Sequence, residues 1–179
     1  HTPGHAIEAG WFLMDHAMEV GDDELVARAA EIIDWSYDAG WDDEYGGLYY
    51  FLDSSGLSPV PLEWNMKLWW PHCEAMIAYA LAYRATGATR HMERFHAVAK
   101  YTMEHFADSE HGEWFGYLDR TGGITHTFKG GPYKGCFHVP RALMMCEQIL
   151  ATVAGGGDGS DGSGDEGSGA AAATGSAGG

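Results

Sequence analysis

A repeat with a period of about 66 residues limits the fold of this chain more than any other feature. Three similar segments each begin at a histidine, at His5, His72 and His138, so the intervals are 67 and 66 residues. Between them lie two turn-rich segments, 46–56 and 112–123, which share a glycine, aromatic residues and a Leu-Asp-x-x-Gly sequence. Aromatic residues around such a turn suit a short β-hairpin. A fixed period of this length is typical of stacked supersecondary units.

The distribution of apolar residues predicts two kinds of helix within each unit. Residues 5–20 and 66–86 are apolar around most of the helical circumference, which indicates helices buried on all sides. Residues 24–38 and 90–107 carry their apolar side chains on one stripe and charged side chains opposite, which indicates surface helices. Residues 138–154 repeat the buried pattern. The helices should therefore form an inner and an outer ring.

We predict an all-α chain whose helices alternate between the inner and the outer ring and are joined by short β-hairpins. Two and a half helix pairs cannot close a ring, so residues 1–154 are predicted to form one domain, an incomplete α/α toroid. Asp22 is a plausible N-cap for the first outer helix. Residues 155–179 contain only Gly, Ser, Asp, Glu, Ala and Thr, which predicts a disordered low-complexity tail.

Charge and cysteine usage exclude several kinds of partner. The formal net charge is −16 at pH 7, and binding to nucleic acid or to an anionic membrane depends on clustered Lys and Arg. The three cysteines form no CxxC pattern, no secretory signal opens the chain, and no apolar run approaches the ~20 residues that span a bilayer. We expect a cytoplasmic protein that binds a small molecule and neither nucleic acid nor membrane.

The repeated histidines are the main candidates for a functional site. Equivalent positions in a ring converge on its axis, so His5, His72 and His138 should line one end of a central cavity. A single histidine at such a position is usually structural, but here each has a polar neighbour in an otherwise apolar helix. These neighbours are Glu8, Glu74 and Arg141. Burial of such groups is costly unless they are paired or used, which favours a shared site.

Three chemistries fit this set of residues, and spacing alone does not choose among them. A metal site would use imidazoles and carboxylates, but HExxH and similar ligand spacings are absent, so none is predicted. A glycosidase would use two carboxylates, for which Glu8 and Glu74 are available. Proton abstraction beside a carbonyl needs a base that titrates near neutral pH, which histidine supplies.

Other residues receive weaker predictions. Trp70 and Trp64 are candidates for a cavity wall, and Cys73 and Cys136 are interpreted as small buried packing residues. The glycine-rich segment 130–135 lacks the GxxxxGK[ST] pattern and only weakly indicates phosphate binding. The remaining candidates are read as surface or loop histidines: His16, His91, His96, His105, His111 and His126.

Three long motifs closely resemble the N-acylglucosamine 2-epimerase family, also known as renin-binding protein. They are PGHAIEAGWFL from Pro3, MKLWWPHCEAMIAY from Met66 and FKGGPYKGCFHVPRALMMCE from Phe128, and the likeness spans residues 2–150. The family fold is an (α/α)6 barrel. The resemblance therefore implies that residues 1–154 are the C-terminal part of such a barrel.

The resemblance also implies an isomerase of amino-sugar metabolism that interconverts N-acetylglucosamine and N-acetylmannosamine. One histidine removes the proton from C2 of the open-chain sugar, and the other returns a proton on the opposite face. The implied catalytic residues are His5 and His138. The predicted substrate-binding residues are Glu74, Arg141, Glu8, His72 and Trp70.

Further expectations come from the family alone. No cofactor is required, ATP acts as an allosteric effector, the protein is a homodimer, and it binds a renin-like protease. The family also uses an Arg and a His from an N-terminal half, so these 179 residues are predicted to be inactive alone. The alternatives are a 2-epimerase or isomerase of unacetylated sugars such as mannose or cellobiose, a non-catalytic protein-binding relative, and an (α/α)6 glycosidase.

Overall fold

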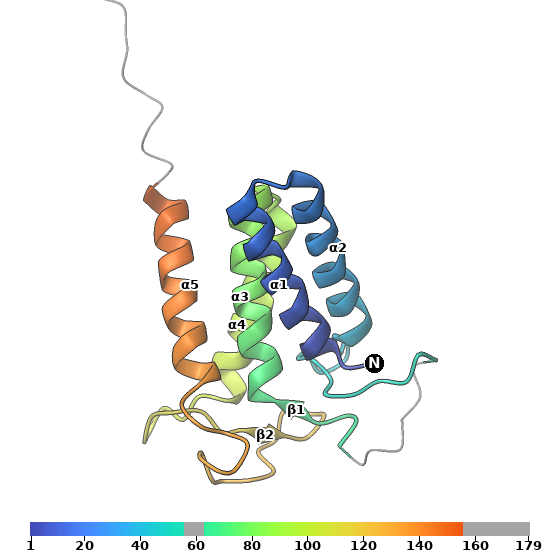
Figure 1. The fold of residues 1–179 in the computed structure, drawn as a ribbon. Helices are drawn as coiled ribbons and strands as arrows, with labels where there is room; N and C mark the ends of the chain where they lie inside the picture. Colours follow the sequence, from blue (N-terminus) through green and yellow to red (C-terminus); the bar gives the residue numbers. More distant parts are fainter. Residues whose placement is uncertain (56–62, 156–179) are drawn as a thin grey trace, which may run out of the picture.

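The structure is a computed structural model that describes residues 1–55 and 63–155 (Figure 1). Its elements, in chain order, are α1 (Pro3–Val20), α2 (Asp23–Gly40), β1 (Lys67–Leu68), α3 (Trp69–Thr86), α4 (Thr89–His105), β2 (Tyr117–Leu118) and α5 (His138–Gly155). The predicted tail, apart from Gly155, lies outside the described residues. Within those residues, no helix combines the length and the apolarity that a membrane span requires.

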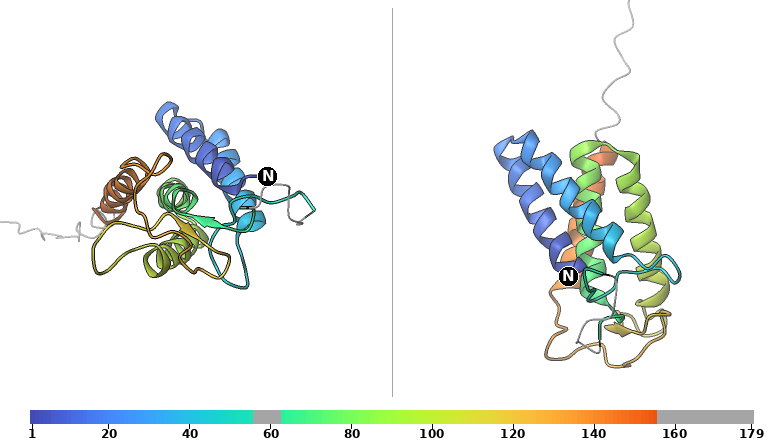
Figure 2. Two further views of the ribbon diagram at one scale, coloured as in Figure 1. Left: turned by 90° about the horizontal axis from the view of Figure 1, so that it is seen from below. Right: turned by 90° about the vertical axis from the view of Figure 1, so that its right-hand side faces the viewer.

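Helix α3 forms the centre of the molecule. Every residue from Trp69 to Ala82 is buried, and α3 packs against α1, α4 and α5 (Figure 2). Helix α2 packs against α1. The outer helices α2 and α4 bury one face each, as their amphipathic patterns predict. The predicted alternation of inner and outer helices is therefore confirmed.

Helix α5 is less buried than its sequence predicts. It buries a single stripe of Val139, Ala142, Cys146 and Ile149, which matches its packing against α3. Leu143 and Met144 are exposed, because the described residues contain no outer helix that covers this side of α5. The sequence of α5 thus has the apolar pattern of an inner helix, but among the described helices α5 packs mainly against α3.

Local signals explain where the first helices end and begin. Gly21 ends α1 in the left-handed region with φ of 73°, a conformation that costs glycine little. The Asp22 carboxylate then accepts a hydrogen bond from the Leu25 backbone N–H at 3.0 Å, so the predicted N-cap of α2 is confirmed.

The turns that follow the outer helices repeat the period of the sequence. The carboxylates of Asp42 and Asp108 each accept hydrogen bonds from the backbone N–H groups two and three residues later, at 2.9 to 3.3 Å. Equivalent backbone bridges close the two turns: Trp41 with Leu48, and Ala107 with Trp114. Each aspartate satisfies backbone donors that the tight turn leaves unpaired.

The strands pair differently from the two predicted hairpins. The second segment does form a local hairpin, with a bridge between Leu118 and Ile124. The first segment instead bonds to the residues that precede α3, because the backbone N–H of Tyr50 donates to the Met66 carbonyl at 3.0 Å. Strand β1 from that stretch then pairs antiparallel with β2, which links successive units.

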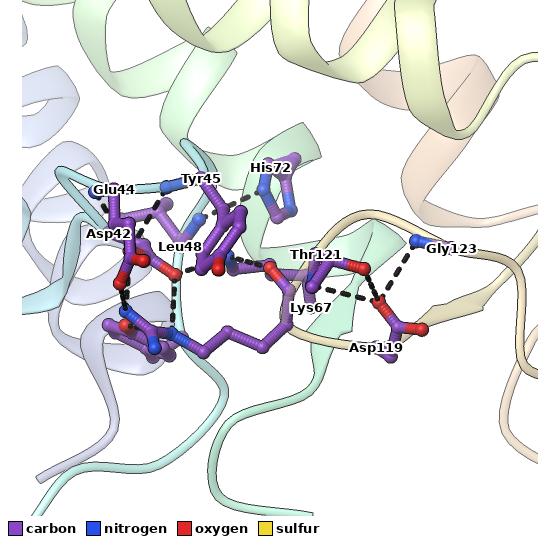
Figure 3. Close-up of polar contacts among 11 residues, drawn as sticks. Asp42, Glu44, Tyr45, Leu48, Lys67, His72, Asp119, Thr121 and Gly123 are labelled. Atoms are coloured by element: carbon purple, nitrogen blue, oxygen red, sulfur yellow. Dashed lines mark hydrogen bonds and ion pairs between the residues drawn. The ribbon is translucent and has the colours of Figure 1, made fainter.

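A buried ionic cluster holds these loops together (Figure 3). The Lys67 ammonium lies 2.7 Å from the Asp42 carboxylate and also donates to the Arg120 carbonyl. The Arg120 guanidinium donates to Asp42 at 3.0 Å and to the Tyr49 hydroxyl at 2.9 Å. Burial alone would raise the pKa of Asp42, but hydrogen bonds from Arg120 and Lys67 hold that pKa well below its usual range. Burial lowers the pKa of Lys67.

A second ionic cluster joins the outer helices around Asp34 of α2. Its carboxylate accepts hydrogen bonds from Arg90 and Arg94 of α4, and it lies 3.4 Å from Nε2 of His91. Burial would raise the pKa of Asp34, but His91 and Arg94 lower it to about 2. The prediction that His91 is a surface residue is wrong, because Asp34 and Thr86 give its fully buried ring polar partners.

We expect Lys67→Met to lower the free energy of unfolding by about 3 kcal/mol, because it removes one cation from a carboxylate that stays buried. Urea denaturation followed by circular dichroism measures the change. Lys100→Met is the matched control, since its ion pair with Glu104 is exposed and should contribute less than about 1 kcal/mol. Equal losses in the two variants would contradict a structural role for the buried cluster.

Candidate active site

A cavity of about 580 Å³ opens where the N-terminal ends of α1, α3 and α5 meet. The helices contribute His5 and Glu8 from α1, Trp69 and Trp70 from α3, and His138 from α5. The connecting segments contribute the remaining wall: Tyr50, Glu63, Met66, Leu68, Tyr117, Tyr133 and Phe137. The cavity is therefore built from all three inner helices and from the turns between them.

The two histidines that the family resemblance assigns to catalysis lie at this cavity and contact the same indole ring. The ring centroid of Trp70 is 4.7 Å from that of His5 and 5.9 Å from that of His138. His5 is exposed, whereas His138 is partly buried. Trp70 is thus a residue of the cavity wall, as predicted, and both imidazoles contact it.

Glu74 lies beneath the cavity and connects the three inner helices. Its side chain has no exposed surface. Oε2 accepts a hydrogen bond from Nε1 of Trp11 at 2.9 Å, while Oε1 contacts Nδ1 of His138 at 2.7 Å and the guanidinium of Arg141. A buried carboxylate is tolerated only when paired in this way. Glu74 is therefore placed to hold His138, and its side chain does not line the cavity.

The contact with Glu74 determines which nitrogen of His138 is available for chemistry. Because an ionised carboxylate only accepts hydrogen bonds, the contact with Glu74 favours the tautomer of His138 that carries its proton on Nδ1. Nε2 of the neutral ring is then unprotonated and can accept a proton. Arg141 balances the charge of Glu74, and it does not belong to the cavity wall.

Glu8 is a second carboxylate at this site, one helical turn beyond His5. It lines the cavity, and its Oε1 lies 3.7 Å from the Arg141 guanidinium. Burial and then the negative charge of Glu74 raise the pKa of Glu8. The predicted set of Glu8, Glu74, Arg141, Trp70 and two of the histidines is thus brought together.

The structure does not place His72 in the cavity. Its ring is fully buried among Tyr101 and Phe106, with ring centroids 5.3 and 4.8 Å away. Nδ1 lies 2.6 Å from the Leu68 carbonyl, and Nε2 accepts a hydrogen bond from the Leu48 backbone N–H at 3.0 Å (Figure 3). Both nitrogens are engaged with backbone, so His72 is not placed to contact a ligand in this cavity, contrary to the prediction.

Helix geometry explains this difference. His72 is two residues from both Trp70 and Glu74, and each residue of an α-helix turns by about 100°, so His72 points about 200° away from them. Trp70 and Glu74 are four residues apart and share one face. The nearly equal spacing of the three histidines in the sequence does not place them at equivalent positions in their helices. His5 is the third residue of α1, His72 is the fourth residue of α3, and His138 is the first residue of α5.

The weaker predictions have mixed outcomes. Cys73 is buried as expected, and burial raises the pKa of its thiol, whereas Cys136 is exposed and the packing interpretation is wrong for it. Trp64 stacks on Tyr49 at 5.8 Å and is not part of the cavity wall. The segment 130–135 lines a second cavity of about 520 Å³, and its Lys134 is buried against Glu113.

Sequence reasoning missed most of the cavity wall that comes from the loops. Tyr50 and Tyr117 belong to the segments interpreted as hairpins, Met66 to the predicted helix 66–86, and Tyr133 to the glycine-rich segment 130–135, so none of them is predicted as a wall residue. The available signal was the density of aromatic residues next to each inner helix. Among residues 1–55 and 63–155, no group of three or more His, Cys, Asp or Glu side chains is placed to hold a metal ion.

Solved structures with the same arrangement of helices define the class of fold. D-mannose isomerase matches with a TM-score of 0.74 and 24% identity, over 85% of this chain and 38% of its own. Cellobiose 2-epimerase from Spirochaeta thermophila DSM 6192 matches with a TM-score of 0.68 and 24% identity, over 86% and 38%. The chain is thus part of an (α/α)6 barrel, as predicted.

The sequence comparisons identify the family within that class. The model of the N-acylglucosamine 2-epimerase (GlcNAc 2-epimerase) family matches residues 1–142, so the chain belongs to this family. It is 54% identical to N-acylglucosamine 2-epimerase of Rattus norvegicus and 50% identical to that of Homo sapiens, over 85% of the chain in both cases. Cellobiose 2-epimerase of Ruminococcus albus is 31% identical over 84% of the chain. The chain spans 36% of the length of the rat and human relatives.

The environment of His72 predicts a loss of stability in acid. Burial lowers its pKa from 6.5 to about 3, so the folded state keeps the ring neutral while the unfolded state is protonated below pH 6.5. This contribution to stability is complete above pH 6.5 and is lost as the pH falls toward 3. Between pH 6.5 and 5 the loss should reach about 2 kcal/mol, at 1.36 kcal/mol for each unit.

Urea denaturation at pH 7 and pH 5 tests this effect. His72→Gln is less stable than the wild type at pH 7, but it cannot titrate, so the difference between the two should shrink by about 2 kcal/mol at pH 5. The exposed His96→Gln variant controls for the replacement of a histidine at the surface. A difference that stays constant between the two pH values would exclude His72 as the source.

Proposed function

We propose that this chain carries the catalytic pair of an isomerase that inverts C2 of an N-acylated hexosamine and interconverts N-acetylglucosamine and N-acetylmannosamine. The observation that carries the proposal is that His5 and His138 both line one cavity and both contact Trp70 there. Two imidazoles at one cavity can act on opposite faces of a single carbon. The identity of 50–54% to N-acylglucosamine 2-epimerases supports the same reaction.

The reaction requires the open-chain form of the sugar, in which C2 lies beside the C1 aldehyde. One imidazole takes the C2 proton, and the electron pair of that bond moves toward the C1 oxygen to form an enediolate-like intermediate. The other imidazole returns a proton to C2 from the opposite face. Nε2 of His138 suits the first role in one direction of the reaction, because Glu74 keeps the proton on Nδ1.

The geometry disfavours the glycosidase alternative. A glycosidase needs two carboxyl groups that flank the scissile bond. Glu74 is fully buried, and both of its oxygens already have partners, so the predicted pair of Glu8 and Glu74 cannot flank a bond in the cavity, which Glu8 lines together with Glu63. The two acidic residues therefore have different positions, and a pair of histidines remains the better candidate for proton transfer.

Action on unacetylated sugars is the second candidate, and the lower identity of 31% to a cellobiose 2-epimerase makes it the weaker one. The rest of the proposal depends on the family resemblance: a cytoplasmic homodimer that needs no cofactor, with ATP as effector and a renin-like protease as a protein partner. A binding role that needs no catalysis would survive the loss of both histidines.

A chimeric enzyme tests the proposed function. Residues 1–155 replace the matching C-terminal segment of the rat N-acylglucosamine 2-epimerase, to which they are 54% identical. We expect the chimera to interconvert the two N-acetylated sugars, His5→Asn and His138→Asn to lose at least about 10²-fold in kcat, and the control His96→Asn to keep its activity. The chain alone should be inactive. An active His5→Asn, His138→Asn double variant would refute the assignment.

Isotope exchange tests the chemistry separately. When the chimera works in D2O, a two-base mechanism predicts one deuterium at C2 of each product molecule, because the proton returned comes from the second imidazole. Mass spectrometry of the product measures this deuterium. A product that retains the original hydrogen at C2 would show that no proton exchange with solvent accompanies epimerisation, which contradicts the mechanism.

A further inference from the structure

We propose that the indole N–H of Trp11 is a positioning group for the base His138, acting through Glu74. The proposal rests on the proposed function, in which His138 exchanges the C2 proton. Trp11 is not part of the cavity wall, so it acts on the reaction only through the residues that it holds. Its hydrogen bond to Glu74 joins α1 to α3, and the two residues are 63 positions apart in the chain.

The hydrogen bonds around Glu74 show why the indole is needed. Oε1 of Glu74 is shared by His138 and Arg141, and Oε2 accepts from Nε1 of Trp11 at 2.9 Å. Within the described residues, Trp11 is the only hydrogen-bond partner of Oε2. Without the indole N–H this oxygen would be buried and unpaired, which a carboxylate relieves by rotating toward another donor. Rotation about the last side-chain bond would take Oε1 away from His138.

Trp11 also contacts Arg141, the cation that pairs with Glu74 beside His138. The Arg141 guanidinium lies 5.4 Å from the Trp11 ring centroid, at a distance typical of a cation–π contact. Trp11 is almost fully buried, and it lies one helical turn beyond Glu8 on the helix that carries His5. One side chain of α1 thus touches both Glu74 and Arg141, the two groups beside Nδ1 of His138, and the same helix carries His5.

A competing interpretation is that Trp11 only fills the core. If Trp11 only fills the core, its ring volume matters and its N–H does not. If Trp11 positions His138, loss of the N–H alone should have an effect. Replacing Trp11 with β-(3-benzothienyl)alanine exchanges the N–H for sulfur and keeps the shape of the ring. Trp11→Phe removes both the donor and part of the volume. Trp41→Phe is the matched control, because Trp41 is a partly buried tryptophan that packs on Tyr37 and Tyr101, away from Glu74.

The first readout uses the whole 179-residue chain with 15N-labelled histidine. In the native chain, the nitrogen shifts of His138 should show a proton on Nδ1. We expect both Trp11 variants to shift population from the Nδ1–H to the Nε2–H form, whereas Trp41→Phe leaves His138 unchanged. If the benzothienyl variant folds and its His138 shifts equal those of the native chain, the proposal is overturned.

The second readout is the kinetics of the chimera. We expect the Trp11 variants to lose about tenfold or more in kcat, a part of the 10²–10⁴-fold that a positioned base contributes, with a smaller change in KM. A rise in KM at constant kcat would contradict the proposal. If the unmodified chimera is itself inactive, the proposed function fails, and the nitrogen shifts still decide whether Trp11 positions His138.

Discussion

The arrangement of the inner helices depends on one buried carboxylate. Glu74 of α3 has no exposed surface, and its charge is stabilised only where Trp11 of α1 and His138 and Arg141 of α5 reach it together. A loss of any one partner leaves a buried acceptor or an uncompensated charge, which costs more than an apolar contact of the same size. The apolar core attracts these helices to one another, but hydrogen bonds to Glu74 fix how far each one slides and turns.

Two polar clusters lie at the end of the molecule that holds the cavity, whereas the Asp34 cluster joins the outer helices elsewhere. Lys67, Asp42 and Arg120 are paired within the loops there, and Glu74 lies beneath the cavity itself. Hydrogen bonds are directional, whereas apolar contacts tolerate small displacements, so this end is the more accurately positioned one. The opposite end needs less accuracy, and there simple glycine caps such as Gly21 and Gly87 end the inner helices.

The sequence predicted the helices and most of the helical part of the site, because both depend on local pattern. Apolar periodicity located all five helices, and the residue types of His5, Glu8, Glu74 and Arg141 marked polar groups in apolar surroundings. It failed for His72, since a sequence interval of 66 residues carries no information about rotation around a helix axis. It also failed for buried Lys67, because a lysine is ordinarily exposed and its partners Asp42 and Arg120 come from distant turns. The loop residues of the cavity wall depend on such long-range contacts, which local pattern does not encode.

The two proposed bases both lie at the start of an inner helix. His5 and His138 lie in the first turns of α1 and α5, where backbone N–H groups and the positive end of the helix dipole favour negative charge. In the proposed reaction the enediolate-like intermediate is an anion, so the inner helices that carry the two proposed bases would also stabilise it. The three inner helices run in the same direction, so their N-terminal ends gather at the cavity, where an anionic intermediate of the proposed reaction would be stabilised.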